Sequence, residues 1–259
     1  MRPDPALDPQ TRALYGDILR APPGHVFDAA VATTYSLDFE TALVIPATLA
    51  FHAAESRAET LDTPLALLEG LERLAGRIAI FCEAGRIHGA PKGANRLTAL
   101  LEDTVTEVAA PGGGAFHPKL WLLRFRPLGD GPARLRLAIL SRNLTQDISW
   151  DLSLCLDGTV GETEAPANAP LVGLLSALPN LAAGRATPER SSALVASLLP
   201  DLARAVWERP PGVDTVAFAV NGLGGAPWRP RVGRALGIVS PFATVGAPAT
   251  LTAGLAPEA

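Results

Sequence analysis

Two apolar runs of strand length, separated by a short polar turn, constrain the fold of this chain more than any other feature. Residues 116–126 read FHPKLWLLRFR and residues 134–140 read RLRLAIL, with PLGDGPA between them. Short apolar runs bounded by Gly and Pro are typical of β-strands, and a turn of this kind is typical of a hairpin. We therefore expect the two runs to be antiparallel neighbours in a sheet.

Further strands and helices are indicated on both sides of this hairpin. Other strand-like runs cover residues 26–36, 77–85, 104–110 and 150–158. Helical spacing of apolar residues is found over 39–55, 61–76, 95–103, 171–178 and 190–206. Strands that alternate with helices and then follow one another closely indicate an α/β protein, with a mixed β-sheet flanked by helices on both faces.

Changes in composition divide the chain into three parts. Residues 1–158 contain the strands of the sheet, and residues 159–213 begin with an Ala/Pro-rich linker and continue with helices. Residues 214–259 hold two more strand-like segments, 214–222 and 235–244. The segment GIVSPFAT has the character of the early strand AVATTYS, so we interpret this last part as the start of a second, incomplete lobe.

Composition sets broad limits on function. Hydrophobic residues make up 48% of the 259 positions, which is enough for a sizeable core. A net charge of −4 argues against a protein that coats nucleic acid with overall basic charge, but it leaves a local basic cleft open. The N-terminal stretch has no apolar signal-peptide region, and no run approaches the length of a membrane span. We expect a cytoplasmic protein without membrane partners.

The cysteines and histidines do not form a metal motif. Cys82 and Cys155 each lie in an apolar stretch, which favours reduced thiols in the core over a disulfide, although pairing stays an alternative. With two cysteines and four scattered histidines, the spacing of a Cys/His zinc site is absent. We therefore expect no metal and no other cofactor.

Polar side chains gather where the hairpin strands begin and end. His117 and Lys119 are two residues apart, so they project to the same side at the start of the first strand. Ser141 and Asn143 have the same spacing directly after the second strand. In an antiparallel pair these two ends meet at one edge of the sheet. Asp151 begins the next strand, where its carboxylate could orient one of the four.

This set of side chains suits phosphoryl chemistry. A lysine supplies positive charge to a phosphate oxygen, while Asn and Ser supply neutral hydrogen-bond donors. A histidine can act as the nucleophile toward phosphorus or as a general acid/base. The pattern His-x-Lys alone also occurs by chance at ordinary strand ends, so the hypothesis depends on Ser141 and Asn143 as well.

Two other places carry candidate substrate-binding residues. Arg86, His88 and Lys92 lie in a basic loop that follows a predicted strand, where they could track a nucleic-acid backbone. A solvated loop without function explains the same residues. Trp150 lies beside the SRNLT loop and is a candidate for stacking on a base, whereas we expect Trp121 to pack in the core.

The segments FHPKLWLL, ILSRNLT and WDLSL resemble the phospholipase D superfamily, whose signature is H-x-K followed by G-S/T-x-N and an acidic residue. Their form is closer to the nuclease and tyrosyl-DNA phosphodiesterase branches than to the lipid hydrolases. The stretch PPGHVFDAAVATTYSLDF is similar to the first strand and helix of bacterial phospholipase D-like proteins. The resemblance covers roughly residues 15–158 and implies a phospholipase D-like catalytic lobe.

The resemblance also implies roles for the residues. His117 would attack phosphorus and form a phosphohistidine intermediate, while Lys119 and Asn143 hold the phosphoryl oxygens. Asp151 corresponds to the acidic residue that orients a partner histidine. That second histidine, which protonates the leaving group, would come from a second H-x-K lobe in a longer chain or from a homodimer partner.

Three departures from the family pattern keep a second hypothesis open. Arg124 stands where the family has an aspartate, Leu140 stands where it has a glycine, and the chain contains no second H-x-K. The first hypothesis is a metal-independent phosphodiesterase, a bacterial nuclease acting on DNA or RNA. The alternative is a catalytically inactive module that binds nucleic acid or assembles a larger defence or repair protein. A lipid hydrolase is disfavoured by the lack of a membrane-directed segment.

Overall fold

The computed structural model describes residues 15–57, 76–89, 101–147 and 151–224, together with the single positions 72, 74, 99, 149, 228, 246 and 249. The chain forms two compact units, Met1–Phe218 and Ala219–Ala259. Every helix and strand named below belongs to the first unit.

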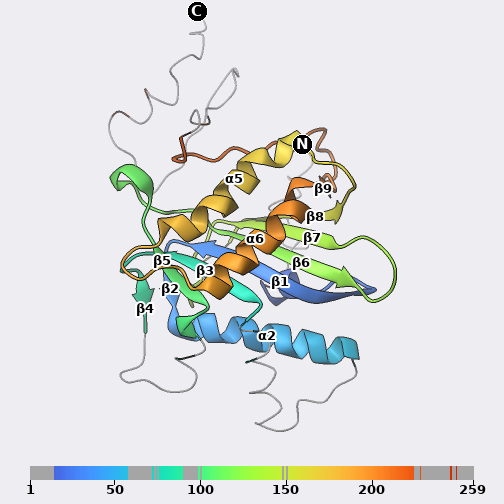
Figure 1. Ribbon diagram of the computed structural model, residues 1–259, viewed down its shortest axis with the longest axis horizontal. Helices are drawn as coiled ribbons and strands as arrows, with labels where there is room; N and C mark the ends of the chain where they lie inside the picture. Colours follow the sequence, from blue (N-terminus) through green and yellow to red (C-terminus); the bar gives the residue numbers. More distant parts are fainter. Residues whose placement is uncertain are drawn as a thin grey trace, which may run out of the picture. The chain divides into compact units, whose positions relative to one another are not determined.

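The centre of the first unit is a seven-stranded sheet in the order β5-β3-β1-β6-β7-β8-β9 (Figure 1). Three strands run parallel to one another: β1 (His25–Thr34), β3 (Ile78–Glu83) and β5 (Val105–Val108). The other four are each antiparallel to the strand before them in that order: β6 (Leu120–Pro127), β7 (Arg134–Leu140), β8 (Ser153–Val160) and β9 (Ala205–Trp207). A small parallel sheet joins β2 (Leu37–Asp38) to β4 (Ile87–His88).

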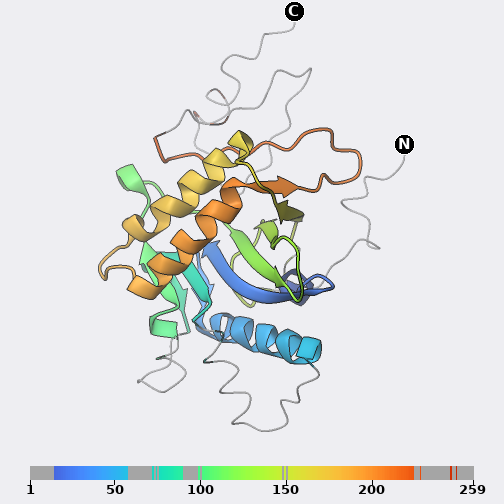
Figure 2. The ribbon, with the colours of Figure 1, turned by 45° about the vertical axis from the view of Figure 1, so that its right-hand side comes forward.

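Helices cover both faces of the sheet, which confirms the predicted α/β class with a mixed sheet (Figures 1 and 2). On one face lie α1 (Tyr15–Leu19) and α2 (Phe39–Arg57), and on the other lie α5 (Ala169–Ala177) and α6 (Glu189–Ala203). Short 3-10 turns complete the unit at η3 (Pro111–Gly113), η4 (Pro166–Asn168) and η5 (Leu178–Leu181).

The core follows from the alternation of side chains along β6. Trp121, Leu123 and Phe125 are each fully buried in one cluster with Ile45 and Leu49 of α2. Successive residues of a strand point to opposite faces, so Leu122 lies on the other side of the sheet. Trp121 therefore packs in the core, as predicted. This rigid centre of the sheet supports the loops at its edge.

The topology brings the ends of many strands to one edge. Thr33 of β1 pairs with Leu120 at the start of β6, and Leu120 pairs with Ile139 near the end of β7. Leu140 in turn pairs with Ser153 at the start of β8. The carboxyl ends of β1, β3, β5 and β7 therefore meet the amino ends of β6 and β8, and we call this the site edge.

The helices after residue 158 are integral to the first unit. Leu171, Leu174 and Leu175 of α5 are buried, and so are Val195, Leu198 and Leu202 of α6. The strand β9 pairs with β8 and ends the sheet. The compact unit thus extends through the interval 159–213, which the composition had indicated as a linker with helices.

The strand predicted over 214–222 and the buried position predicted for Cys155 are wrong, whereas both cysteines are free thiols as predicted. The strand expected over 214–222 is not formed, although Val216, Phe218 and Val220 alternate with exposed neighbours as in a strand. The Phe218 ring packs edge-on against Trp207, with 6.1 Å between ring centroids, so its burial needs no strand partner. Cys155 is exposed because β8 lies near the edge of the sheet, whereas Cys82 is buried, and both thiols are free.

Two further predicted elements lie partly or wholly outside the residues that the structure describes. The segment 235–244 lies outside the described residues, as does most of the helix expected over 61–76. In the part of the chain that the structure describes, no helix combines the length and the apolar character needed to cross a membrane.

Candidate active site at one edge of the sheet

His117 and Lys119 lie in the loop that enters β6, three residues and one residue before the strand begins at Leu120. The sequence had predicted a strand from residue 116, but the chain arrives from η3, where Gly112 and Gly113 have φ angles of 68° and 76°. Such left-handed conformations are readily adopted by glycine. The loop therefore approaches β6 irregularly, and His117 remains exposed while Lys119 is buried.

The two side chains contact each other directly. Lys119 Nζ lies 3.0 Å from Nδ1 and 3.3 Å from Nε2 of His117, and it also donates to the carbonyl oxygen of His117 over 3.3 Å. Strand β1 holds the segment between them, because Thr33 Oγ1 donates to the carbonyl oxygen of Pro118 at 3.0 Å. The prediction that the imidazole and the ammonium project together is confirmed.

This environment lowers the pKa values of both groups. Partial burial lowers the pKa of His117 below its ordinary value, the neighbouring Lys119 ammonium lowers it further, and the carboxylate of Glu83 opposes the shift. Burial also lowers the pKa of Lys119. An imidazole with a lowered pKa is unprotonated at neutral pH, so one ring nitrogen keeps its lone pair for attack or for proton transfer.

Tyr35 connects Asn143 to this pair. The residue follows β1 directly, and its backbone N–H donates to Oδ1 of Asn143 over 3.3 Å. Its ring packs against the imidazole of His117, with 4.8 Å between ring centroids and an angle of 45° between planes. The structure thus gathers His117, Lys119 and Asn143 around Tyr35, a residue that the sequence did not indicate as part of the site.

Ser141 and Asp151 form a separate pair beside this group. Asp151 Oδ1 accepts hydrogen bonds from Ser141 Oγ at 2.7 Å, from the Ser141 N–H at 2.9 Å and from the Arg142 N–H at 3.1 Å. Ser141 Oγ in turn accepts the N–H of Leu152 at 2.9 Å. The Asp151 carboxylate therefore shapes the turn that leads out of β7, and among the described contacts none joins it to His117 or Lys119.

The predicted substrate-binding residues do not all lie at the site edge. Arg86 is exposed, and its Cζ lies 5.1 Å from the centroid of the Tyr35 ring, so it belongs to the site edge. His88 is exposed on β4, where it is paired with Asp38, and no described contact brings it to His117. Lys92 and Trp150 lie outside the described residues.

Glu83 is a further residue of the site that the sequence did not reveal. It ends β3, and its Oε2 accepts the backbone N–H of Phe116 at 2.8 Å, immediately before His117. The nearby Glu107 of β5 accepts the N–H of Gly85 at 2.7 Å. A position at the carboxyl end of a parallel strand is the signal that could have found both Tyr35 and Glu83, because ligands bind there in α/β sheets.

Arg124, the departure from the family pattern, does not point to this site. Its guanidinium reaches α6 instead, where Nη1 donates to the Ser197 carbonyl oxygen at 2.7 Å and to Asp201 Oδ2 at 3.0 Å. Its Nε donates to Asp28 Oδ2 at 2.7 Å. Arg124 therefore connects the sheet to α6.

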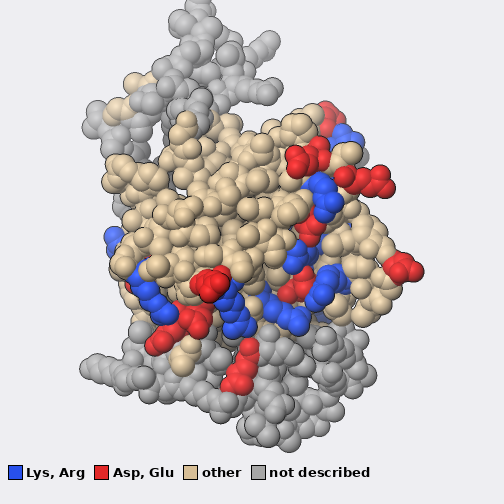
Figure 3. Space-filling model, viewed as in Figure 1, with Lys and Arg blue, Asp and Glu red and all other residues tan. Residues whose placement is uncertain are grey.

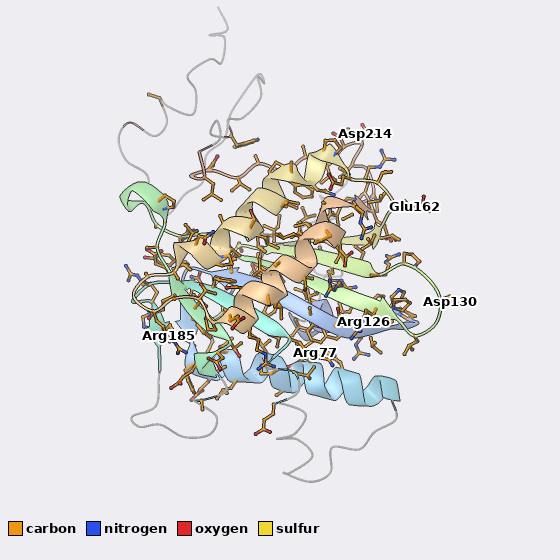
Figure 4. The ribbon with its side chains drawn as sticks, in the orientation of Figure 1. Arg77, Arg126, Asp130, Glu162, Arg185 and Asp214 are labelled. Atoms are coloured by element: carbon orange, nitrogen blue, oxygen red, sulfur yellow. The ribbon has the colours of Figure 1, made fainter. Side chains whose placement is uncertain are left out.

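Charges of both signs mingle elsewhere on the molecule. In the view of Figure 3, acidic and basic residues alternate around the rim, while the surface over α5 and α6 shows few of either. Figure 4 places Arg126 and Asp130 at the hairpin turn, the end of β6 and β7 opposite to the site edge. The viewed face thus presents no continuous basic surface.

Within the described ranges, no group of three or more His, Cys, Asp or Glu side chains is placed to hold a metal ion. The chain matches no model of a known protein family, and no curated protein is significantly similar to it. Its function must therefore be argued from the site. An unprotonated imidazole can attack a phosphoryl group, and a buried ammonium and a side-chain amide can stabilise the negative charge on its oxygens.

Proposed function

We propose that this protein is a metal-independent phosphodiesterase with a phospholipase D-like lobe, and that it hydrolyses DNA or RNA. One observation carries the proposal: Lys119 Nζ lies within 3.3 Å of both ring nitrogens of the exposed His117. This geometry holds a nucleophile and a cation close enough to act on one phosphate. Asn143, which Tyr35 joins to the same group, adds a neutral donor for a second phosphate oxygen.

The reaction follows from these positions. A ring nitrogen of His117 attacks phosphorus in line, and the new P–N bond forms as the bond from phosphorus to the leaving oxygen breaks. Lys119 and the amide N–H groups of Asn143 stabilise the negative charge on the phosphoryl oxygens. A second histidine, from another copy or another lobe, donates a proton to the leaving oxygen. Water then attacks phosphorus and releases the product and the free imidazole.

Nucleic acid is the proposed substrate because of the cations at the site edge. Arg86 adds an exposed positive charge over the Tyr35 ring, which packs against His117. A nucleic-acid strand carries a phosphate at every nucleotide, so a second phosphate is present to bind Arg86.

The test is hydrolysis of single- and double-stranded DNA and RNA by the full chain in the presence of EDTA. We expect His117→Ala to lower kcat/KM by at least roughly a thousandfold, as removal of a nucleophile does. His25→Ala is the matched control, because His25 begins β1 and pairs with Pro127, at the end of the strands opposite to the site edge. Full activity of His117→Ala would contradict the proposal. A covalent adduct that is trapped by denaturation at alkaline pH, where a P–N bond survives, and mapped to His117 would support it.

A second candidate is a nucleic-acid-binding or assembly module without catalysis. It is favoured by the single H-x-K of the chain and by the use of Asp151 within the Ser141 turn. Tight, salt-sensitive binding of nucleic acid without cleavage in any of the assays above would support this module and exclude the nuclease.

A further inference from the structure

Tyr35 lies between two functional groups that come from different strands. Its ring contacts the His117 imidazole at 4.8 Å and the Arg86 guanidinium at 5.1 Å from the ring centroid. Its backbone is held from both sides, because the N–H donates to Asn143 and the carbonyl oxygen accepts the thiol of Cys82 at 3.5 Å. The ring therefore forms a platform between the nucleophile and a cation, and two hydrogen bonds hold the backbone that carries it.

The position of Arg86 is determined by the backbone and by this platform. Its carbonyl oxygen accepts the N–H of Leu37 at 3.0 Å, and its own N–H donates to the Glu83 carbonyl oxygen at 3.2 Å. A guanidinium over an aromatic face gains cation–π stabilisation and keeps its N–H groups free at the edges. In the described part of the chain, no carboxylate forms an ion pair with Arg86, which remains exposed to solvent.

The separation of the two groups suits consecutive phosphates. The two ring distances of 4.8 and 5.1 Å together limit the separation of the Arg86 Cζ and the imidazole centroid to less than 10 Å. Successive nucleotides of one strand advance by about 3.4 Å along the axis of a duplex, and further when the strand is extended. A guanidinium within this range of His117 reaches the phosphate next to the one under attack.

We propose that Tyr35 and Arg86 form a second phosphate subsite, which binds the phosphodiester adjacent to the scissile one and selects polynucleotides over substrates with a single phosphate. The subsite deepens the proposed function and rests on His117 marking the position of the scissile phosphate. Arg86 supplies the charge-assisted hydrogen bonds, and Tyr35 positions its guanidinium. A charge-assisted hydrogen bond of this kind is worth roughly a tenfold to a hundredfold change in affinity.

The experiment measures binding in the absence of cleavage. The full chain carrying His117→Ala is titrated into a short fluorescein-labelled oligothymidylate, and anisotropy gives Kd at several salt concentrations. The dinucleotide TpT, which has one phosphodiester, is measured as a competitor. We expect Arg86→Gln to weaken oligothymidylate binding by about tenfold or more and to reduce the salt slope by about 0.7, the value for one phosphate contact on a single strand. The affinity for TpT should stay unchanged.

Three further variants isolate the contact. Arg185→Gln removes the charge of an exposed arginine, 67% accessible, near Asp103 before the amino end of β5, and should change neither Kd nor slope. Tyr35→Phe keeps the aromatic ring and should bind as its parent does. Tyr35→Leu removes the platform, so adding Arg86→Gln to it should have little further effect on oligothymidylate binding.

The outcomes separate the subsite from the hydrolysis. Unchanged oligothymidylate binding by Arg86→Gln, an equal loss for TpT, or no binding by the parent chain at low salt would each overturn the subsite. If the unsubstituted chain never cleaves nucleic acid but Arg86→Gln still loses affinity and slope, the subsite stands and the proposed hydrolysis fails.

Discussion

His117 takes its chemical character from its partial burial and from three neighbours that lie at or beside the ends of different strands. Burial lowers its pKa, Lys119 before β6 lowers the pKa further, Glu83 at the end of β3 raises it, and Tyr35 directly after β1 packs against the ring. Partial burial is the largest influence and favours the neutral imidazole. The net effect is a histidine whose ring stays neutral under conditions where an ordinary histidine is partly protonated.

The pH dependence of kcat/KM on an oligonucleotide tests this environment. Protonation of His117 removes the attacking lone pair, so activity should fall as the pH drops through a pKa that lies below the ordinary value of about 6.5. Glu83→Gln removes the charge that raises this pKa and keeps an oxygen for the Phe116 N–H. The acid limb of that variant should move to lower pH, and a shift to higher pH would contradict the assignment.

At the scale of elements, Arg124 connects the sheet to α6. It links Asp28 of β1 with Asp201 and the Ser197 carbonyl oxygen of α6, and the side chains of Arg124, Asp28 and Asp201 are only 16%, 12% and 19% exposed. Asp28 lies where the register between β1 and β6 shifts, at a β-bulge. Partly buried, hydrogen-bonded ion pairs of this kind are costly to break because one charge is left without its partner.

We therefore expect Arg124→Gln to lower the free energy of unfolding by about 2 kcal/mol, the scale of a lost hydrogen bond to a charged group. Arg126→Gln is the control: Arg126 pairs with the same Asp28, but its side chain is 59% exposed, so its loss should cost about 0–1 kcal/mol. Urea unfolding of both variants gives the comparison. Equal losses would show that the anchoring of α6 does not depend on Arg124.

At the scale of the whole molecule, the sheet and its covering helices form one compact unit. Residues Met1–Phe218 include every strand of the seven-stranded sheet as well as α2, α5 and α6. The polar groups of the site edge come from β1, β3, β6 and β7 or the loops beside them, all within that unit. Residues Ala219–Ala259 form the second unit.

A chain shortened to residues 1–218 should keep the urea midpoint of the full chain and its affinity for oligothymidylate. The reason is that the buried core and the site residues are retained. Circular dichroism during urea unfolding and anisotropy measure the two properties. A lower midpoint would show that the second unit stabilises the first, and lost affinity alone would place a binding residue in the second unit.

Local patterns in the sequence determined the elements themselves. Alternation and turn residues predicted the hairpin of β6 and β7, whose second strand was predicted with its observed bounds of 134–140. His117 and Lys119 do contact each other as predicted, although they lie in the loop before β6 and not in a strand. Local patterns predict a hairpin because they report the geometry of a single strand or turn. They failed at 214–222, where alternation is present but no strand partner is formed.

Only the tertiary structure decided which residues meet. Strand order in the sheet depends on packing between segments far apart in the chain. Local patterns could place Tyr35 and Glu83 at strand ends, but they did not show that both would contact the loop of His117 or that Arg86 would lie over the Tyr35 ring. Packing also directed Asp151 to Ser141 and Arg124 to α6. The sequence alone determined the chemical groups that the site can use. The position of β1 between β3 and β6 decided which of these groups are neighbours, because contacts between strands are made in space and not along the chain.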